Sequence, residues 1–262
     1  MICIELNDSE IRVARGLDIV LKSPGYAVSN NGNIELGTAA VQKSRLNPRS
    51  TNNRFWKNLN QDPIQNFSNG IRHNADLAYH HLLTIHEQVG KPEEVLFAIP
   101  GNYSNDQLSL LLGLADACQF KAIGLVDSAI AAVANEVGDG DYIHIDIHLY
   151  QTVLTHINVS DQVSRISVEN IEGTGLSTIY DICAVQIADM FIKHSRFDPQ
   201  HHAETEQALY NQIPSCLNAL KTQSEFLLEI QYQNTQQQVK VNSKDLIVPL
   251  KSHYQKILNS IS

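Results

Sequence analysis

Residues 94–135 are the part of the sequence that most constrains the fold. The apolar run at residues 95–99 is short enough for a strand buried on both faces, and a proline and a glycine follow it. Ser104 is a good N-cap for the next segment, in which leucines recur at helical spacing. Residues 120–126 predict a second buried strand, and residues 129–135 a second helix. This order of strands and helices predicts a parallel sheet in an α/β protein.

Short strands are predicted on both sides of this stretch. Residues 1–36 predict a meander of short strands, and residues 142–171 predict a second meander of three strands. Each meander leads into helices, so we interpret the chain as two related lobes, residues 1–136 and 137–262. Within the second lobe, a helix, two strands and a last helix are expected as a subdomain at about residues 200–262.

Composition narrows the classes of partner and compartment. The chain has 262 residues, of which 43% are hydrophobic, so it can bury a sizeable core. Its formal net charge of −9 argues against nucleic acid or an anionic membrane as a partner, because phosphates would be repelled. The sequence shows no CxxC pair, no 18-residue apolar run and no signal peptide pattern, so we expect reduced cysteines and a cytoplasmic location. The cysteines are Cys3, Cys118, Cys183 and Cys216.

Three blocks of sequence carry a resemblance to a known family. Residues 98–107 read AIPGNYSNDQ, residues 124–134 read GLVDSAIAAVA, and residues 208–246 predict a helix, two strands and the start of a helix. In this order they resemble the actin–Hsp70–sugar kinase superfamily, and most closely the nucleotide-binding domain of Hsp70 chaperones. The resemblance implies a two-lobed actin-like ATPase (ribonuclease H-like) fold with mixed sheets flanked by helices. Because the sequence stops at Ser262, after the last predicted helix, the second lobe is expected to be incomplete.

The resemblance also locates the two hairpin turns that grip phosphates in this family. Only glycine lets the backbone approach a phosphate that closely. In the first turn Asn7 replaces the glycine, followed by Asp8 and Ser9, and Asp8 adds negative charge where phosphate would lie. The second turn falls on residues 146–151, where His148 and the next two residues replace all three glycines. Asn7, Asp8, Ser9 and His148 are therefore the candidate cofactor-binding residues of these turns.

Other positions of the family's site are changed as well. The glutamate that positions water falls on Asp127, which is one methylene shorter, and Asp146 is the second candidate catalytic residue. Of the family's adenine clamp only the final basic residue remains, as Lys221. Gly173 and Gly175 precede a predicted helix and are a candidate anion site, with a structural role as the alternative.

These changes predict weak nucleotide binding. A charge-assisted hydrogen bond contributes roughly 1.5–3 kcal/mol, so losing two or three weakens binding by about 10³-fold or more. We therefore expect no cofactor, and a non-catalytic pseudo-ATPase that acts by binding another protein. The alternative is a divergent ATPase or chaperone-like switch that binds ATP and Mg²⁺, in which Asp127, Asp146 and Ser9 handle the metal and phosphate.

The predicted strand that ends near residue 149 carries a candidate metal site. His144, Asp146 and His148 alternate along it, so their side chains share one face. Histidine and carboxylate groups in this arrangement are candidate metal ligands. The alternative is a strand whose polar face meets the cleft or solvent and whose other face, including Ile143 and Ile145, is core.

Residues 37–66 are polar and rich in Asn, Arg and Gln, and we expect them to run over the surface of the first lobe. Aromatic and arginine side chains in such a loop are typical anchors of protein interfaces. The alternative is that Trp56 pins the loop onto its own lobe. The candidate interface residues are Arg45, Arg49, Arg54, Phe55 and Trp56.

Overall fold

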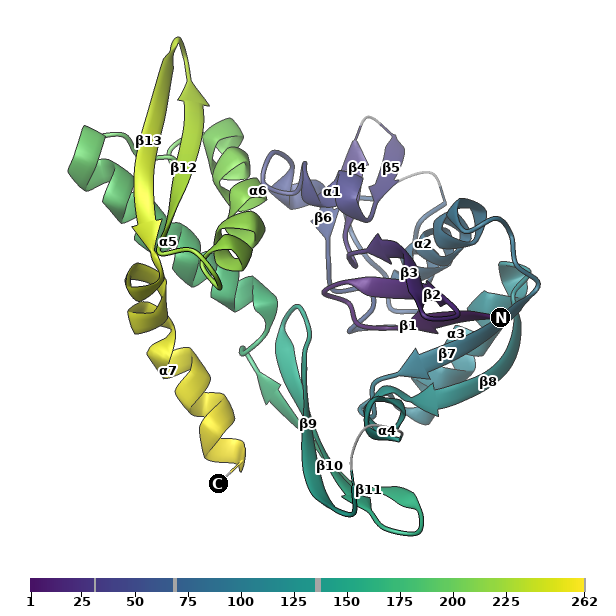
Figure 1. Cartoon of the computed structure of the whole chain (residues 1–262). Coiled ribbons are helices and arrows are strands. Elements are labelled where there is room, and N and C mark those ends of the chain that lie inside the picture. The colour runs from purple at the N-terminus through teal and green to yellow at the C-terminus, as the bar shows by residue number, and fades with distance from the viewer. Residues whose placement is uncertain (31, 68–69, 135–137, 262) are drawn as a thin grey trace.

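The computed structural model describes residues 1–30, 32–67, 70–134 and 138–261 (Figure 1). We refer to residues 1–134 as the N-terminal half and to residues 138–261 as the C-terminal half. Each half contains β-sheets flanked by helices, so the chain is a mixed α/β protein, as predicted. The boundary expected between residues 136 and 137 and the expected helix end at Asn135 lie outside the described residues.

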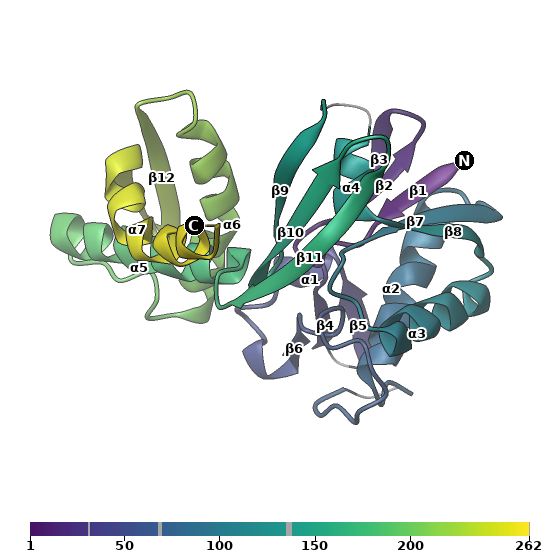
Figure 2. The ribbon, with the colours of Figure 1, turned by 90° about the horizontal axis from the view of Figure 1, so that it is seen from below.

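The N-terminal half is built on a five-stranded sheet. Its elements are β1 (Ile2–Glu5), β2 (Ile11–Arg15), β3 (Asp18–Ser23), α2 (Asn74–Gln88), β7 (Glu94–Ile99), α3 (Asn105–Ala117) and β8 (Lys121–Asp127). The strand order is β3-β2-β1-β7-β8. β1, β2 and β3 form the predicted antiparallel meander, whereas β7 runs parallel to β1 and β8 runs parallel to β7. Helices α2 and α3 cover one face of this sheet (Figure 2).

The central strand–helix–strand unit lies where the sequence predicts it. Ser104 caps α3: its Oγ accepts a hydrogen bond from the Gln107 amide at 3.2 Å, and the Gln107 side chain accepts one from the Ser104 amide at 3.0 Å. The parallel pairing of β7 with β8 is confirmed. The prediction that this second strand is buried is wrong, because β8 is the outer strand of the sheet and Ile123 and Leu125 are 45% and 38% exposed. A short helix, α4 (Ser128–Val133), follows β8.

Residues 37–66 are more ordered and more buried than the sequence predicts. They contain α1 (Thr38–Val41), a 3₁₀ turn (Pro48–Ser50) and β6 (Thr51–Asn52), which extends a small sheet formed by β4 (Ala27–Asn30) and β5 (Asn33–Leu36). Phe55 and Trp56 lie in the N-terminal core, at 0% and 1% exposure.

Trp56 is held in that core by hydrogen bonds as well as by packing. Its Nε1 donates to Nδ1 of His81 at 3.0 Å, and the Tyr103 hydroxyl donates to its carbonyl at 3.3 Å. The interpretation of Phe55 and Trp56 as surface anchors is therefore wrong, and the alternative, a loop pinned by Trp56, is the arrangement found. Of the candidate interface residues, Arg49 and Arg54 are exposed.

The C-terminal half begins with a three-stranded antiparallel sheet and continues into a helical region. Its elements are β9 (Gly140–Ile147), β10 (Gln151–Val159), β11 (Val163–Glu172), α5 (Leu176–Ser195), α6 (Ala203–Ala219), β12 (Glu225–Tyr232), β13 (Thr235–Asn242) and α7 (Ser243–Ile261). The order in the three-stranded sheet is β11-β10-β9. The hairpin of β12 and β13 and helices α5, α6 and α7 lie together beyond this sheet (Figure 1).

Each half has its own large hydrophobic cluster. One is formed by the five-stranded sheet with α2 and α3, and the other by α5, α6, α7 and the β12–β13 hairpin. The four cysteines are free thiols, of which Cys118, Cys183 and Cys216 are buried. Within the described ranges, no helix is both long enough and apolar enough to cross a bilayer.

Candidate functional site

Two hairpin turns from opposite halves meet in the middle of the molecule. One turn joins β1 to β2 and carries Asp8; the other joins β9 to β10 and carries His148. Asp8 and His148 are 5% and 4% exposed. The backbone amide of Leu149 donates to Oδ1 of Asp8 at 2.8 Å, so a carboxylate from the N-terminal half binds the backbone of the second turn directly.

His148 lies between two carboxylates. Its Nδ1 is 3.2 Å from Oδ1 of Asp8, and its Nε2 is 3.1 Å from Oδ2 of Asp146. Burial lowers the pKa of His148, but the hydrogen bonds and charges of Asp146 and Asp8 outweigh burial and raise this pKa to about 9. The imidazole is therefore protonated at neutral pH and donates from both ring nitrogens.

Asn7, Ser9 and Asp146 complete the contact between the turns. The Asn7 amide nitrogen donates to Oδ1 of Asp146 at 2.7 Å and to the Ile147 carbonyl at 3.2 Å. The Ser9 hydroxyl donates to Oδ1 of Asn7 at 2.6 Å. Burial raises the pKa of Asp146, but bonds to His148 and Asn7 and nearby histidine charge lower it overall. The sequence singled out these residues separately, and the structure brings them into one network.

The network has an excess of negative charge at the place where the two turns meet. It contains two carboxylates and one imidazolium, and the Leu149 amide that faces it already binds Asp8. An incoming phosphate would meet a carboxylate of the same sign and a backbone donor that is already satisfied. Charge repulsion in a buried site is weakly screened, so this arrangement disfavours anions strongly.

Gly173 and Gly175 support the second turn and do not form an anion site. The first amides of α5, on Leu176 and Ser177, donate to the carbonyls of His148 and Leu149 at 2.8 and 2.9 Å. A Cβ added at Gly175 would lie 2.4 Å from the Leu149 carbonyl group, so only glycine permits this close approach. Backbone carbonyls thus occupy the N-terminus of α5. The two glycines have the structural role that was the alternative to an anion site.

Asp127 is committed to structural bonds on both of its oxygens. Oδ1 accepts from the amides of Ala129 and Ile130 at 2.9 and 3.3 Å, which caps α4. Oδ2 forms an ion pair with Arg165 at 2.5 Å. Arg165 could not be paired with Asp127 from the sequence, because the two residues are 38 positions apart. Lys221 follows the end of α6 and is exposed. It lines neither of the two cavities that are described below.

His144 and Asp146 on β9, and His148 directly after it, share a face, as predicted, and Asp146 and His148 are hydrogen-bonded to each other. Both ring nitrogens of His148 contact carboxylates, at 3.2 and 3.1 Å, so a metal bound there would have to displace a ring proton. Among the described residues no three potential ligands converge. The alternative interpretation of this strand is wrong in one respect, because Ile143 and Ile145 are 43% and 47% exposed rather than core.

Arg45 and Tyr150 form further contacts between the halves, outside the network of the two turns. Arg45 forms an ion pair with Asp181 at 2.9 Å and places its guanidinium 3.6 Å from the centre of the Tyr210 ring. Arg54 stacks in the same way on Tyr150, at 3.6 Å. These partners are far apart in the sequence, so no local pattern could have paired them.

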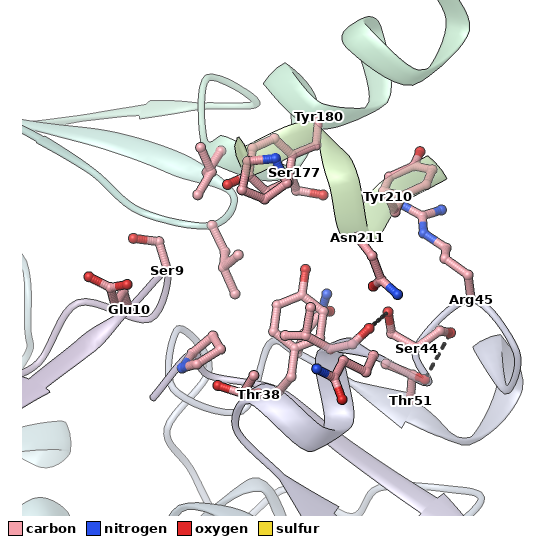
Figure 3. A pocket seen from close by; sticks show the side chains of 18 of the residues that line it. Ser9, Glu10, Thr38, Ser44, Arg45, Thr51, Ser177, Tyr180, Tyr210 and Asn211 are labelled. Atoms are coloured by element: carbon pink, nitrogen blue, oxygen red, sulfur yellow. Dashed lines mark hydrogen bonds between the residues drawn. The ribbon is translucent and has the colours of Figure 1, made fainter. Parts of the chain in front are cut away.

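A cavity of about 630 Å³ lies between the two halves (Figure 3). Figure 3 shows Ser9, Thr38 and Ser44 on one side of it and Ser177 and Tyr180 on the other. A smaller polar cavity of about 200 Å³ adjoins Asp8 and His148 and is also lined by Lys57 and Glu172, which form an ion pair at 2.5 Å. The two turns therefore border both cavities, with Ser9 and Leu149 lining the larger one and Asp8 and His148 the smaller one.

Comparison with known proteins adds no further constraint. No family model and no curated protein matches this chain.

Proposed function

We propose that this protein is a non-catalytic pseudo-ATPase of the Hsp70 nucleotide-domain type, with a two-lobed actin-like fold, that acts in the cytoplasm by binding another protein. Support comes from the two meanders, each at the start of one half, whose first turns meet between the halves. That is the arrangement implied by the sequence resemblance. The turns keep this arrangement although their glycines are replaced.

The observation that carries the proposal is the bond between the Asp8 carboxylate and the Leu149 amide. In the family, backbone amides of this turn hold phosphate; here the protein's own carboxylate binds one of them. His148 adds a charged bond to the same carboxylate. The turns thus bind each other, and the protein does not need a nucleotide to hold its halves together.

One observation favours the alternative, an ATP-dependent switch with divergent turns. The cavity between the halves has a volume of about 630 Å³, within the range of small-molecule sites. Its lining includes Ser9 and four tyrosines, and the carboxylates of Glu10 and Asp181 lie among them. A triphosphate placed here would still meet the negative charge of these groups and of the adjacent network.

Isothermal titration of the protein with Mg-ATP tests the proposal, together with an assay of phosphate release. We expect no saturable heat up to about 1 mM ATP, equivalent to binding weaker than about −4 kcal/mol, and no turnover. A matched titration of Asp8→Asn, which keeps the side-chain size and removes its charge, shows how much of the exclusion is electrostatic. A micromolar dissociation constant for the unmodified protein would refute the proposal and favour the switch.

A further inference from the structure

β9 forms an open edge of the three-stranded sheet. It is the terminal strand in the order β11-β10-β9, and no strand of the described ranges pairs with its outer side. Both views place this side of the sheet toward α7 and away from the N-terminal half (Figures 1 and 2). Unpaired amides and carbonyls along a strand edge are a template for pairing with another chain.

The outer strands of the five-stranded sheet, and the other outer strand of the β11-β10-β9 sheet, carry features that discourage such pairing. β3 and β8 contain Lys22 and Lys121, β11 contains Arg165, and each of these strands joins its neighbour with an irregular register. Charged residues and bulges are the usual protection of an exposed edge. β9 has eight residues without lysine, arginine or proline, and its pairing with β10 is regular throughout. Its two carboxylates are already bonded, Asp141 to Asn158 on β10 and Asp146 to Asn7 and His148.

β9 also exposes large apolar side chains beside its open edge. Ile143 and Ile145 are 43% and 47% exposed and project from the same face of the strand. Apolar residues at alternate positions of an unprotected edge strand are a surface suited to a β-strand partner.

The N-terminal half shows how such an edge is covered in this molecule. β1 is the first strand of its meander, as β9 is of the second, and each pairs with the following strand in antiparallel fashion. On its other side β1 pairs in parallel with β7, with Ile2 opposite Val95 and Ile4 opposite Phe97. The matching side of β9 has no such partner in the described chain.

We propose that the outer edge of β9 binds an extended segment of a partner protein, which adds to the sheet as a parallel strand. The segment has apolar residues at alternate positions, to cover Ile143 and Ile145, and carries no acidic residues, because the chain has a net charge of −9. This proposal rests on the protein-binding part of the proposed function, and it names the surface that binds the partner.

A labelled peptide containing residues 95–99 of β7 (VLFAI) between pairs of lysines is a suitable probe, because β7 occupies the matching edge of β1. Fluorescence anisotropy measures its binding to the full chain without nucleotide. Ile145→Lys should weaken binding by about tenfold or more. Ile166→Lys is the matched control: Ile166 is 57% exposed on β11, at the opposite edge, and this change should alter binding by less than about twofold.

Two N-methylated peptides test whether the backbone pairs. In a strand, alternate residues direct their amides to opposite sides. One peptide is methylated on the amides of the first, third and fifth apolar residues, and the other on the amides of the second and fourth. Only one of these two sets faces β9, so one peptide should lose binding and the other should keep it. Equal binding of both peptides, equal effects of the two lysine variants, or no binding at all would overturn the proposal. So would a homodimer that Ile145→Lys dissociates, since a second copy would then occupy the edge. Micromolar binding of Mg-ATP, in contrast, would refute only the proposal that the protein is a pseudo-ATPase, and not the proposed binding of a strand to β9.

Discussion

Replacing His148 by leucine should destabilise the protein strongly. The side chain is 4% exposed, and its ring nitrogens lie 3.2 and 3.1 Å from carboxylates of opposite halves. His148→Leu leaves Asp8 and Asp146 facing each other without a cation between them. Removing one partner of a buried ion pair costs about 3–5 kcal/mol. At about 2–4 °C for each kcal/mol, we expect the Tm to fall by about 6–20 °C.

The pH dependence of this effect has a definite sign. The pKa of His148 is raised from 6.5 to about 9, so its contribution to stability is complete below about pH 6.5 and is lost as the pH rises through 9. A rise of this size corresponds to about 3 kcal/mol, in line with the range above. The lowered pKa of Asp146 acts in the opposite direction: its contribution is lost only as the pH falls below its ordinary value of 3.8.

Urea unfolding followed by circular dichroism at pH 6 and pH 9.5 measures both effects. The free-energy difference between the wild type and His148→Leu should be large at pH 6 and clearly smaller at pH 9.5. His156→Leu is the control, since His156 pairs with Asp141 at 3.4 Å on the surface, where solvent screens the pair. A difference that does not change with pH, or equal losses in the two variants, would show that the charge network does not hold the halves together.

Two further predictions concern packing. Gly175→Ala should lower the free energy of unfolding by about 1–3 kcal/mol, because the new Cβ would lie 2.4 Å from the Leu149 carbonyl group. Gly113→Ala is the control: Gly113 lies in α3 with open space around it, so this change should stabilise the protein by up to about 1 kcal/mol. Differential scanning fluorimetry measures both variants, and equal shifts of their Tm would contradict this reasoning. Trp56→Ala should lower the free energy of unfolding in urea by about 3–5 kcal/mol, because Trp56 is 1% exposed. Arg49 is exposed, so Arg49→Ala should change this free energy little. A small loss for Trp56→Ala would mean that the side chain is not part of the core.

Elements with a strong local pattern were predictable from the sequence. The parallel strands β7 and β8 and the cap of α3 at Ser104 follow from apolar runs, helical spacing and a capping residue, all within a few positions. The composition of residues 37–66 was misleading, because a polar segment can still place two aromatic side chains in a core. Phe55 and Trp56 show that burial depends on the tertiary structure around a segment, which its own composition does not contain.

The candidate site was only partly predictable. The resemblance identified Asp8 and His148 as members of two turns, but their direct contact joins residues 140 positions apart, and no local spacing reveals it. The alternation along β9 indicated the polar face correctly. It did not indicate that Ile143 and Ile145 would be exposed, because a period of two does not tell a central strand from an edge strand.

The bonds between the second turn and the start of α5 have a mechanical consequence. The carbonyls of His148 and Leu149 hold the first amides of a helix of 20 residues, which is about 30 Å long. A tilt of about 5° at that end moves the far end by about 2.5 Å, given this length. Because α5 also packs against the β12–β13 hairpin, a displacement of Asp8 that tilts the helix would move the hairpin with it.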